Sequence, residues 1–105
     1  MYRSIAEIQS ALHSGKTALD LVEEHLSRIE AHQHLNAFLE VFETSAREQA
    51  IAIDAKIKAG TAGKLAGVIV GIKDNICYKN HRVSASSKIL EGFTSIYTST
   101  VLQRL

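Results

Sequence analysis

Apolar residues recur every three or four positions in three stretches of the first sixty residues, and polar residues separate these stretches. Such spacing places the apolar side chains of a stretch on one face of a helix. The pattern therefore predicts helices near residues 4–13, 17–32 and 44–59. The third is the clearest, because alanine and isoleucine recur at helical intervals from Ala46 to Ile57.

Polar residues at the starts of the first two stretches match helix-start signals. Ser4 precedes Glu7 by three positions, and Thr17 precedes Asp20 by the same interval. This is the spacing of a capping box, in which each side chain accepts a hydrogen bond from the backbone N–H of the other residue. Both pairs therefore predict well-defined helix starts.

An uninterrupted apolar run extends from Leu65 to Ile72 and stops at Lys73. Runs of this length that are rich in β-branched residues are typical of strands buried on both faces of a sheet. We expect a strand near residues 67–72 that presents Lys73 at its end. Residues 38–42 predict either a second short strand or an extended link, so the expected fold class is α/β.

Serine and threonine residues mark two further helix starts after the lysine. Ser84 or Ser86 is expected to cap a short helix, and Thr98 or Ser99 is expected to begin a last helix.

The position of Lys73 leaves two interpretations open. A lysine at the end of a buried strand can be solvated, with no chemical role. Alternatively, desolvation can disfavour its ammonium form, so that the lysine can act as a base.

A family resemblance bears on this choice. The string Gly71–Asn75, preceded by Leu65–Gly67, resembles the lysine block of the amidase signature family. Residues 35–38 (Leu-Asn-Ala-Phe) and 85–91 (Ala-Ser-Ser-Lys-Ile-Leu-Glu) are similar to the amidase subunits of aspartyl/glutamyl-tRNA amidotransferases within that family. The resemblance runs along essentially the whole chain.

The resemblance implies an amidase signature fold and a catalytic role for Lys73. Members of the family use this lysine with two serines, one of them in a cis peptide, and neither serine is matched in this sequence. We therefore expect residues 1–105 to be an N-terminal fragment of a single amidase domain that is inactive alone. In this interpretation residues 1–60 are a helical region and residues 61–105 begin the catalytic core; the residues of the amide pocket stay unknown.

The resemblance also implies a reaction and partners. The expected activity is release of ammonia from glutamine, for conversion of Glu-tRNA(Gln) to Gln-tRNA(Gln) by a complex with B and C subunits. ATP and magnesium would be used by a partner subunit, with no cofactor in this chain. Two alternatives stay open: a stand-alone amidase of the same family, and a non-enzymatic helical interaction module.

Composition is ordinary for a folded domain, at 46% hydrophobic and 22% charged residues with a net charge of +1. Such a charge gives no basic field for direct tRNA binding.

The single cysteine, Cys77, excludes an intramolecular disulfide and suits a reducing compartment. The sequence has no run of about 18 apolar residues that would predict a membrane span, and we expect a cytoplasmic location. Proline is absent, which departs from the family near the lysine block.

Other candidate residues favour structural roles. His32 and His34 lie near a helix end with His25 upstream, and no cysteine pair or carboxylate completes a metal site there. The doublet at 86–87 is expected to cap or brace a loop rather than to supply a nucleophile.

For three residues near the lysine, Cys77, Asp74 and Asn75, the sequence leaves two roles open. Cys77 is expected to be a structural thiol, with a nucleophile activated by His81 as the less favoured interpretation. Asp74 and Asn75 can line the site, where the carboxylate would hold the lysine ammonium, or can serve structure alone.

Overall fold

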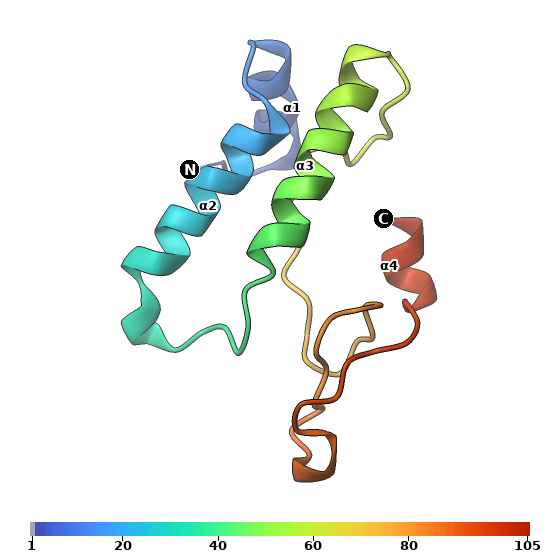
Figure 1. The fold of residues 1–105 in the computed structure, drawn as a ribbon. Coiled ribbons are helices and arrows are strands. Elements are labelled where there is room, and N and C mark those ends of the chain that lie inside the picture. Colours follow the sequence, from blue (N-terminus) through green and yellow to red (C-terminus); the bar gives the residue numbers. More distant parts are fainter. Residues whose placement is uncertain (1) are drawn as a thin grey trace. The chain divides into compact units, whose positions relative to one another are not determined.

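The computed structural model describes residues 2–105, and its regular elements are helical (Figure 1). In chain order they are α1 (Ile5–His13), α2 (Ala18–Ala31), the 3-10 helix η1 (Gln33–Leu35), α3 (Glu43–Lys58), the 3-10 helix η2 (Lys88–Leu90) and α4 (Thr100–Arg104). The chain forms two compact units. The first contains the residues through Ala37 and Phe42–Ile69, and the second contains Phe38–Val41 and Val70–Leu105.

The three long helices confirm the sequence prediction to within one residue at each end. The Oγ of Ser4 accepts the backbone N–H of Glu7 at 3.2 Å, as expected for the cap of α1. The Glu7 carboxylate, however, accepts from the N–H of Arg3 at 2.7 Å, one residue before the expected partner. The start of α1 is therefore capped in both directions, with the return bond shifted by one position.

The start of α2 leaves few backbone donors to water. Thr17 and Asp20 form the complete capping box, with reciprocal bonds of 3.0 and 2.9 Å. The N–H groups of Ala18 and Leu19 donate to the two carboxylate oxygens of Asp54, at 2.6 and 3.2 Å. Asp54 belongs to α3, so a side chain from a neighbouring helix satisfies donors that α2 cannot satisfy itself.

The core of the first unit lies between α2 and α3. Ala18 and Val22 of α2 are buried together with Ala50 of α3, and half-buried side chains surround them. Leu21 is 1% exposed, the least exposed apolar residue in the described chain. The small residues at this contact let the two helices approach closely, and apolar burial is the main stabilising contribution here.

The prediction of a buried strand at 67–72 is wrong for this structure. Within residues 2–105 the only β-type pairing is an isolated antiparallel bridge between Arg82 and Thr94. Ile69 and Val70 are 41% and 48% exposed, and residues 38–42 likewise form no strand. A strand is stable only when its backbone groups pair with a neighbour. No described segment pairs with this run, so the α/β detail is not confirmed.

The beginning of the apolar run forms a turn instead. The Val68 N–H donates to the Leu65 carbonyl at 3.0 Å, and the side-chain amide of Gln9 in α1 donates to the Lys64 carbonyl at 3.0 Å. Gly67 has φ of +81°, and a Cβ at this position would lie 2.8 Å from a methyl carbon of Leu12. The run therefore starts as a turn packed on the helices of the first unit.

In the second unit, backbone hydrogen bonds join residues 80–83 to residues 93–95. The Val83 N–H donates to the Phe93 carbonyl at 3.2 Å, and the Ser95 N–H donates to the His81 carbonyl at 2.9 Å. Val83 and Ser95 are 5% and 1% exposed. The buried Ser95 hydroxyl is satisfied, because it donates to the Tyr97 carbonyl at 2.7 Å.

The structure corrects one helix start in this unit and confirms another. The short helix η2 begins after Ser87, which makes no side-chain cap bond, so the expected caps at Ser84 and Ser86 are wrong. Ser99 caps α4, with its Oγ accepting the Leu102 N–H at 3.5 Å.

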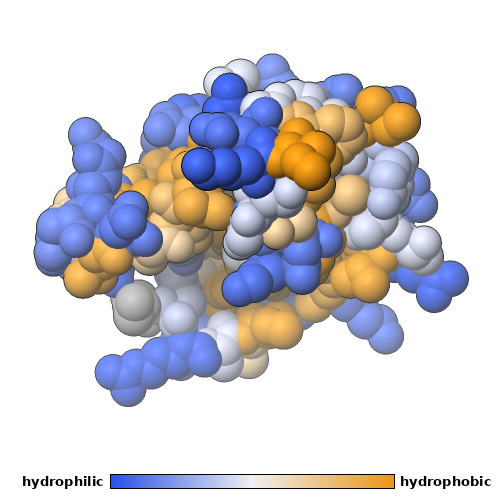
Figure 2. Space-filling model, turned by 90° about the horizontal axis from the view of Figure 1, so that it is seen from below, coloured by the Kyte–Doolittle hydropathy of each residue, from blue (hydrophilic) through white to orange (hydrophobic). Residues whose placement is uncertain are grey.

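Large apolar side chains lie open to solvent in both units, and Figure 2 shows such hydrophobic surface among hydrophilic residues on one face. Ile89 is 93% exposed, Leu39 83% and Ile96 78%. Among the described helices, none has the length and apolar character needed to cross a membrane.

Candidate functional site

Lys73 lies at the start of a turn in the second unit. Its carbonyl accepts the Ile76 N–H at 2.9 Å, which closes a turn over residues 73–76. The Lys73 side chain is exposed and takes part in none of the hydrogen bonds or ion pairs found in residues 2–105. The backbone turn therefore sets where the side chain begins, and no contact among the described residues fixes its ammonium.

Asp74 attaches this turn to a segment ten residues further along the chain. The Ser84 N–H donates to Oδ1 of Asp74 at 3.0 Å, and the Ser84 hydroxyl donates to Oδ2 at 2.5 Å. The Ala85 N–H donates to the Asp74 carbonyl at 2.9 Å. Side chain and backbone of Asp74 thus both bond the loop at 84–85.

The loop that receives Asp74 has an unusual backbone. Ala85 and Ser86 have φ of 49° and 57°, and two successive non-glycine residues in the left-handed region are uncommon. The N–H groups of Ala85 and Ser86 lie close enough to the Asp74 carboxylate to affect its pKa. The Ser84 hydroxyl, followed by the Ser84 N–H, holds the pKa of Asp74 below its ordinary value, and the N–H groups of Ser86 and Ala85 lower it further.

These contacts show which partners the Asp74 carboxylate has. Its carboxylate bonds the Ser84–Ser86 loop and forms no ion pair with Lys73 among the described residues. Asp74 is half-buried, whereas Asn75 is exposed. The alternative in which this carboxylate holds the lysine ammonium is therefore not seen in this structure.

Cys77 lies half-buried near Tyr97. A hydrogen bond with the thiol, together with its charge when ionised, raises the pKa of the Tyr97 hydroxyl. The ring of His81 stacks on Tyr78 with centroids 3.9 Å apart, and its Nδ1 lies 2.8 Å from the Lys79 carbonyl oxygen. The contacts of both residues are those of a packed loop.

The histidines near the end of α2 lie close together without forming a metal site. The rings of His32 and His34 are 6.0 Å apart, and Nδ1 of His32 lies 2.8 Å from the Arg28 carbonyl oxygen. The described residues contain no group of three or more histidine, cysteine or acidic side chains able to hold a metal.

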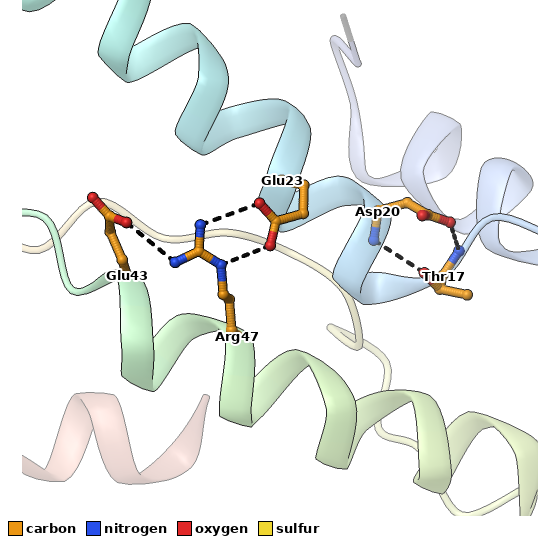
Figure 3. A network of polar contacts seen from close by, with 5 residues as sticks. All are labelled: Thr17, Asp20, Glu23, Glu43 and Arg47. Atoms are coloured by element: carbon orange, nitrogen blue, oxygen red, sulfur yellow. Dashed lines mark hydrogen bonds and ion pairs between the residues drawn. The ribbon is translucent and has the colours of Figure 1, made fainter.

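A charged network in the first unit links α2 to α3 (Figure 3). Arg47 donates to both carboxylate oxygens of Glu23, at 2.7 and 3.2 Å, and to Glu43 at 3.1 Å. The bidentate bond from Arg47 holds the pKa of Glu23 below its ordinary value. The network is solvent-exposed, with 39% of the Arg47 side chain accessible. Its role is to hold two helices together.

Sequence reasoning missed the contacts of two carboxylates, because both contacts join residues that are distant in the chain. Asp54 is 36 positions from the residue it caps, and Asp74 is ten positions from Ser84. Neither spacing matches a local motif, so no sequence signal marks either contact.

Comparison with known proteins assigns the sequence to a family. The model of the Amidase family matches residues 20–105, which includes the turn at Lys73 and the loop that binds Asp74. The chain belongs to the amidase family. No solved structure matches it.

Relatives with a named function align along nearly the whole chain. Three of them carry the name of the A subunit of glutamyl-tRNA(Gln) amidotransferase. Those from Nostoc punctiforme, Paramagnetospirillum magneticum and Methanothermobacter thermautotrophicus are 46%, 43% and 41% identical, each over 97% of this chain. The chain covers 22%, 21% and 23% of these relatives, so it spans about a fifth of their length. This confirms the family resemblance noted from the lysine block.

Proposed function

We propose that this chain is the N-terminal part of the amidase subunit of a tRNA-dependent amidotransferase. The complete subunit would release ammonia from glutamine. The observation that carries the proposal is the 41–46% identity over 97% of the chain to subunits of that name, in an alignment that spans the lysine block. The family match over residues 20–105 supports the amide chemistry independently of those names.

In this proposal Lys73 is the base. It takes a proton from a second serine, which in turn takes one from the nucleophilic serine as that residue attacks the glutamine side-chain amide. The proton returns to the departing ammonia, and water then hydrolyses the acyl-enzyme. Both serines would be supplied by a longer protein. The 105-residue chain is therefore proposed to be inactive alone.

The remaining features of the proposal concern the assembly. B and C subunits would join the amidase subunit, and one of them would use ATP and magnesium to activate mischarged Glu-tRNA(Gln). The tRNA would be reached through the complex, because the net charge of +1 gives this chain no basic field of its own. We place the complex in the cytoplasm. This chain would bind no cofactor.

The test replaces Lys73 in two hosts. The first host is the longest protein encoded by the gene that carries this sequence. The second is a chimera in which these 105 residues replace the matching part of the Nostoc punctiforme relative. Lys73→Ala should abolish glutamine hydrolysis, because a positioned base contributes about 10² to 10⁴-fold to the rate. Lys73→Arg should be nearly as inactive, because a guanidinium does not release its proton at neutral pH.

Two lysines of the same unit provide the controls. Lys79→Ala and Lys88→Ala should each retain glutaminase activity, because neither residue lies in the Gly71–Asn75 string that resembles the family's lysine block. Amidation with added ammonia should survive Lys73→Ala, since ammonia bypasses this site. Glutaminase activity within about threefold of the parent in Lys73→Ala would contradict the proposal, given the contribution expected of a base. Hydrolysis of another amide but not glutamine would favour a stand-alone amidase.

A further inference from the structure

We propose that Asp74 is the positioning residue for Lys73, and that it acts by tying the 73–76 turn to the loop at Ser84–Ser86. The inference deepens the proposed function and rests on it for the catalytic role of Lys73. It assigns Asp74 a task different from charge compensation of the lysine.

The first step of the argument is that Lys73 does not position itself. Its side chain is exposed and has no bonding partner among the described residues. The direction in which the side chain leaves the backbone is therefore set by the turn that the Ile76 N–H closes on the Lys73 carbonyl. Whatever restrains this turn restrains the point from which the lysine side chain reaches the site.

The second step is that Asp74 provides that restraint. Three hydrogen bonds join Asp74 to Ser84 and Ala85: two end on its carboxylate at 3.0 and 2.5 Å, and one ends on its carbonyl at 2.9 Å. The residue immediately after the lysine is thereby fixed on both its side chain and its backbone. Bonds to an ionised carboxylate are stronger than bonds between neutral groups, which makes this attachment firmer than an ordinary turn.

The third step concerns the loop that receives the carboxylate. Ala85 and Ser86 hold positive φ angles, a conformation that costs free energy for residues with a side chain. Such a conformation persists where its surroundings stabilise it. The carboxylate of Asp74 does so by accepting the N–H and the hydroxyl of Ser84, just before these two residues. Anion and loop therefore stabilise each other.

The experiment compares variants that remove the carboxylate bonds to different extents. Asp74→Ala loses both. Asp74→Asn keeps an oxygen for the Ser84 N–H, and its amide can donate to the Ser84 hydroxyl after that hydroxyl rotates. Ser84→Ala loses the hydroxyl bond alone. Glu91→Ala is the control, because Glu91 is an exposed acid of the same unit.

The expected kinetic result is a graded loss of glutamine turnover in both hosts described above. Displacing a catalytic group by about 1 Å can cost about 100-fold, so Asp74→Ala should lower kcat by about 10- to 100-fold with KM nearly unchanged. Ser84→Ala should show a smaller loss, and Asp74→Asn should lose less than Asp74→Ala, because its neutral amide keeps both bonds in a weaker form. Glu91→Ala should equal the parent.

A labelling measurement separates positioning from partial unfolding. An electrophilic glutamine analogue that alkylates the nucleophile should label Asp74→Ala more slowly, but to the same final stoichiometry as the parent. A purely structural role would lower the stoichiometry and leave the rate of the folded fraction unchanged. Turnover at the parent level in Asp74→Ala, or a lowered stoichiometry at an unchanged rate, would overturn the inference.

The 105-residue chain gives a test that does not depend on the proposed function. Amide exchange measured by NMR should show faster exchange at Ile76, Ser84 and Ala85 in Asp74→Ala than in the parent, and parent-like exchange in Glu91→Ala. Unchanged exchange at Ile76 would show that Asp74 does not restrain the turn. If the longer protein hydrolyses no glutamine while the exchange result holds, the proposed function fails and the restraint by Asp74 stands.

Discussion

Replacing Gly67 with alanine should destabilise the first unit more than the same replacement at any other glycine near it. Gly67 has φ of +81°, and a Cβ built there meets a methyl carbon of Leu12 at 2.8 Å and one of Leu21 at 3.5 Å. The substitution therefore combines backbone strain with overpacking. Two neighbouring glycines separate these contributions.

The magnitude follows from the two contributions. A non-glycine residue in the left-handed region costs about 1–2 kcal/mol. The Leu12 methyl lies at the end of a flexible side chain, and moving it off its preferred rotamer costs about 0.5–1.5 kcal/mol. Alanine also restricts the unfolded chain, which offsets about 0.4–1 kcal/mol. The expected loss is about 2 kcal/mol, or a decrease in Tm of about 8–16 °C at about 4–8 °C per kcal/mol.

Gly60 and Gly63 are the matched controls. Gly60 has φ of +72° with no atom within 4 Å of its built Cβ, so Gly60→Ala should show the backbone cost alone, about 1 kcal/mol. Gly63 has neither a positive φ nor a close neighbour, so Gly63→Ala should be neutral or stabilising by up to about 1 kcal/mol. The order of stability should be Gly63→Ala, then Gly60→Ala, then Gly67→Ala.

Urea and thermal unfolding followed by the helical circular dichroism signal give the free energies for all three variants. A double-mutant cycle with Leu12→Ala isolates the overpacking, because removing the clashing methyl should recover about 0.5–1.5 kcal/mol in the Gly67→Ala background. Equal stability of Gly67→Ala and Gly60→Ala would show that the close approach to Leu12 contributes nothing. Equal stability of Gly67→Ala and Gly63→Ala would refute the backbone argument as well.

Two further predictions concern the polar contacts between α2 and α3. Asp54→Ala should lower the free energy of unfolding by about 1–2 kcal/mol in urea titrations, because the first two N–H groups of α2 lose their acceptor. Glu48→Ala, at an exposed position of α3, is the control. Equal losses in both variants would contradict the capping role of Asp54. The pKa of Glu23 is lowered in the folded chain, so the folded state binds fewer protons than the unfolded state as pH falls. The stability that the Glu23–Arg47 contact contributes is full above the unfolded pKa of about 4 and is lost as pH falls through the folded pKa. Arg47→Ala should therefore flatten the acid side of a plot of unfolding free energy against pH, and an unchanged slope would contradict the assignment.

The parts of the fold that could be predicted from the sequence are those whose partners are close in the chain. The capping box of Thr17 and Asp20 closes over three residues, and the apolar stripe of α3 repeats within a single helix. Such signals carry both members of an interaction in one short window. The helices were therefore placed to within one residue.

The parts that could not be predicted depend on pairs that are distant in sequence. Asp54 satisfies donors of α2 across 36 positions, and Asp74 binds Ser84 across ten. Ser84 shows the consequence, because local rules made it a helix cap, whereas the tertiary contact makes it a donor to a carboxylate. For the site itself, the sequence and the family resemblance identified the candidate lysine and Asp74 beside it, but not the bonds from Asp74 to Ser84 and Ala85.

The apolar run before Lys73 follows the same physical rule. Its hydrophobicity predicts burial, but burial of a strand requires backbone partners on its edges and side chains over its faces. The described residues supply neither, and Ile69 and Val70 stay about half exposed. The Lys73 side chain is exposed as well, with no bonding partner among the described residues. The base chemistry in the proposed function therefore requires further residues that cover this site, and activity should be sought in a chain of the length that the relatives have.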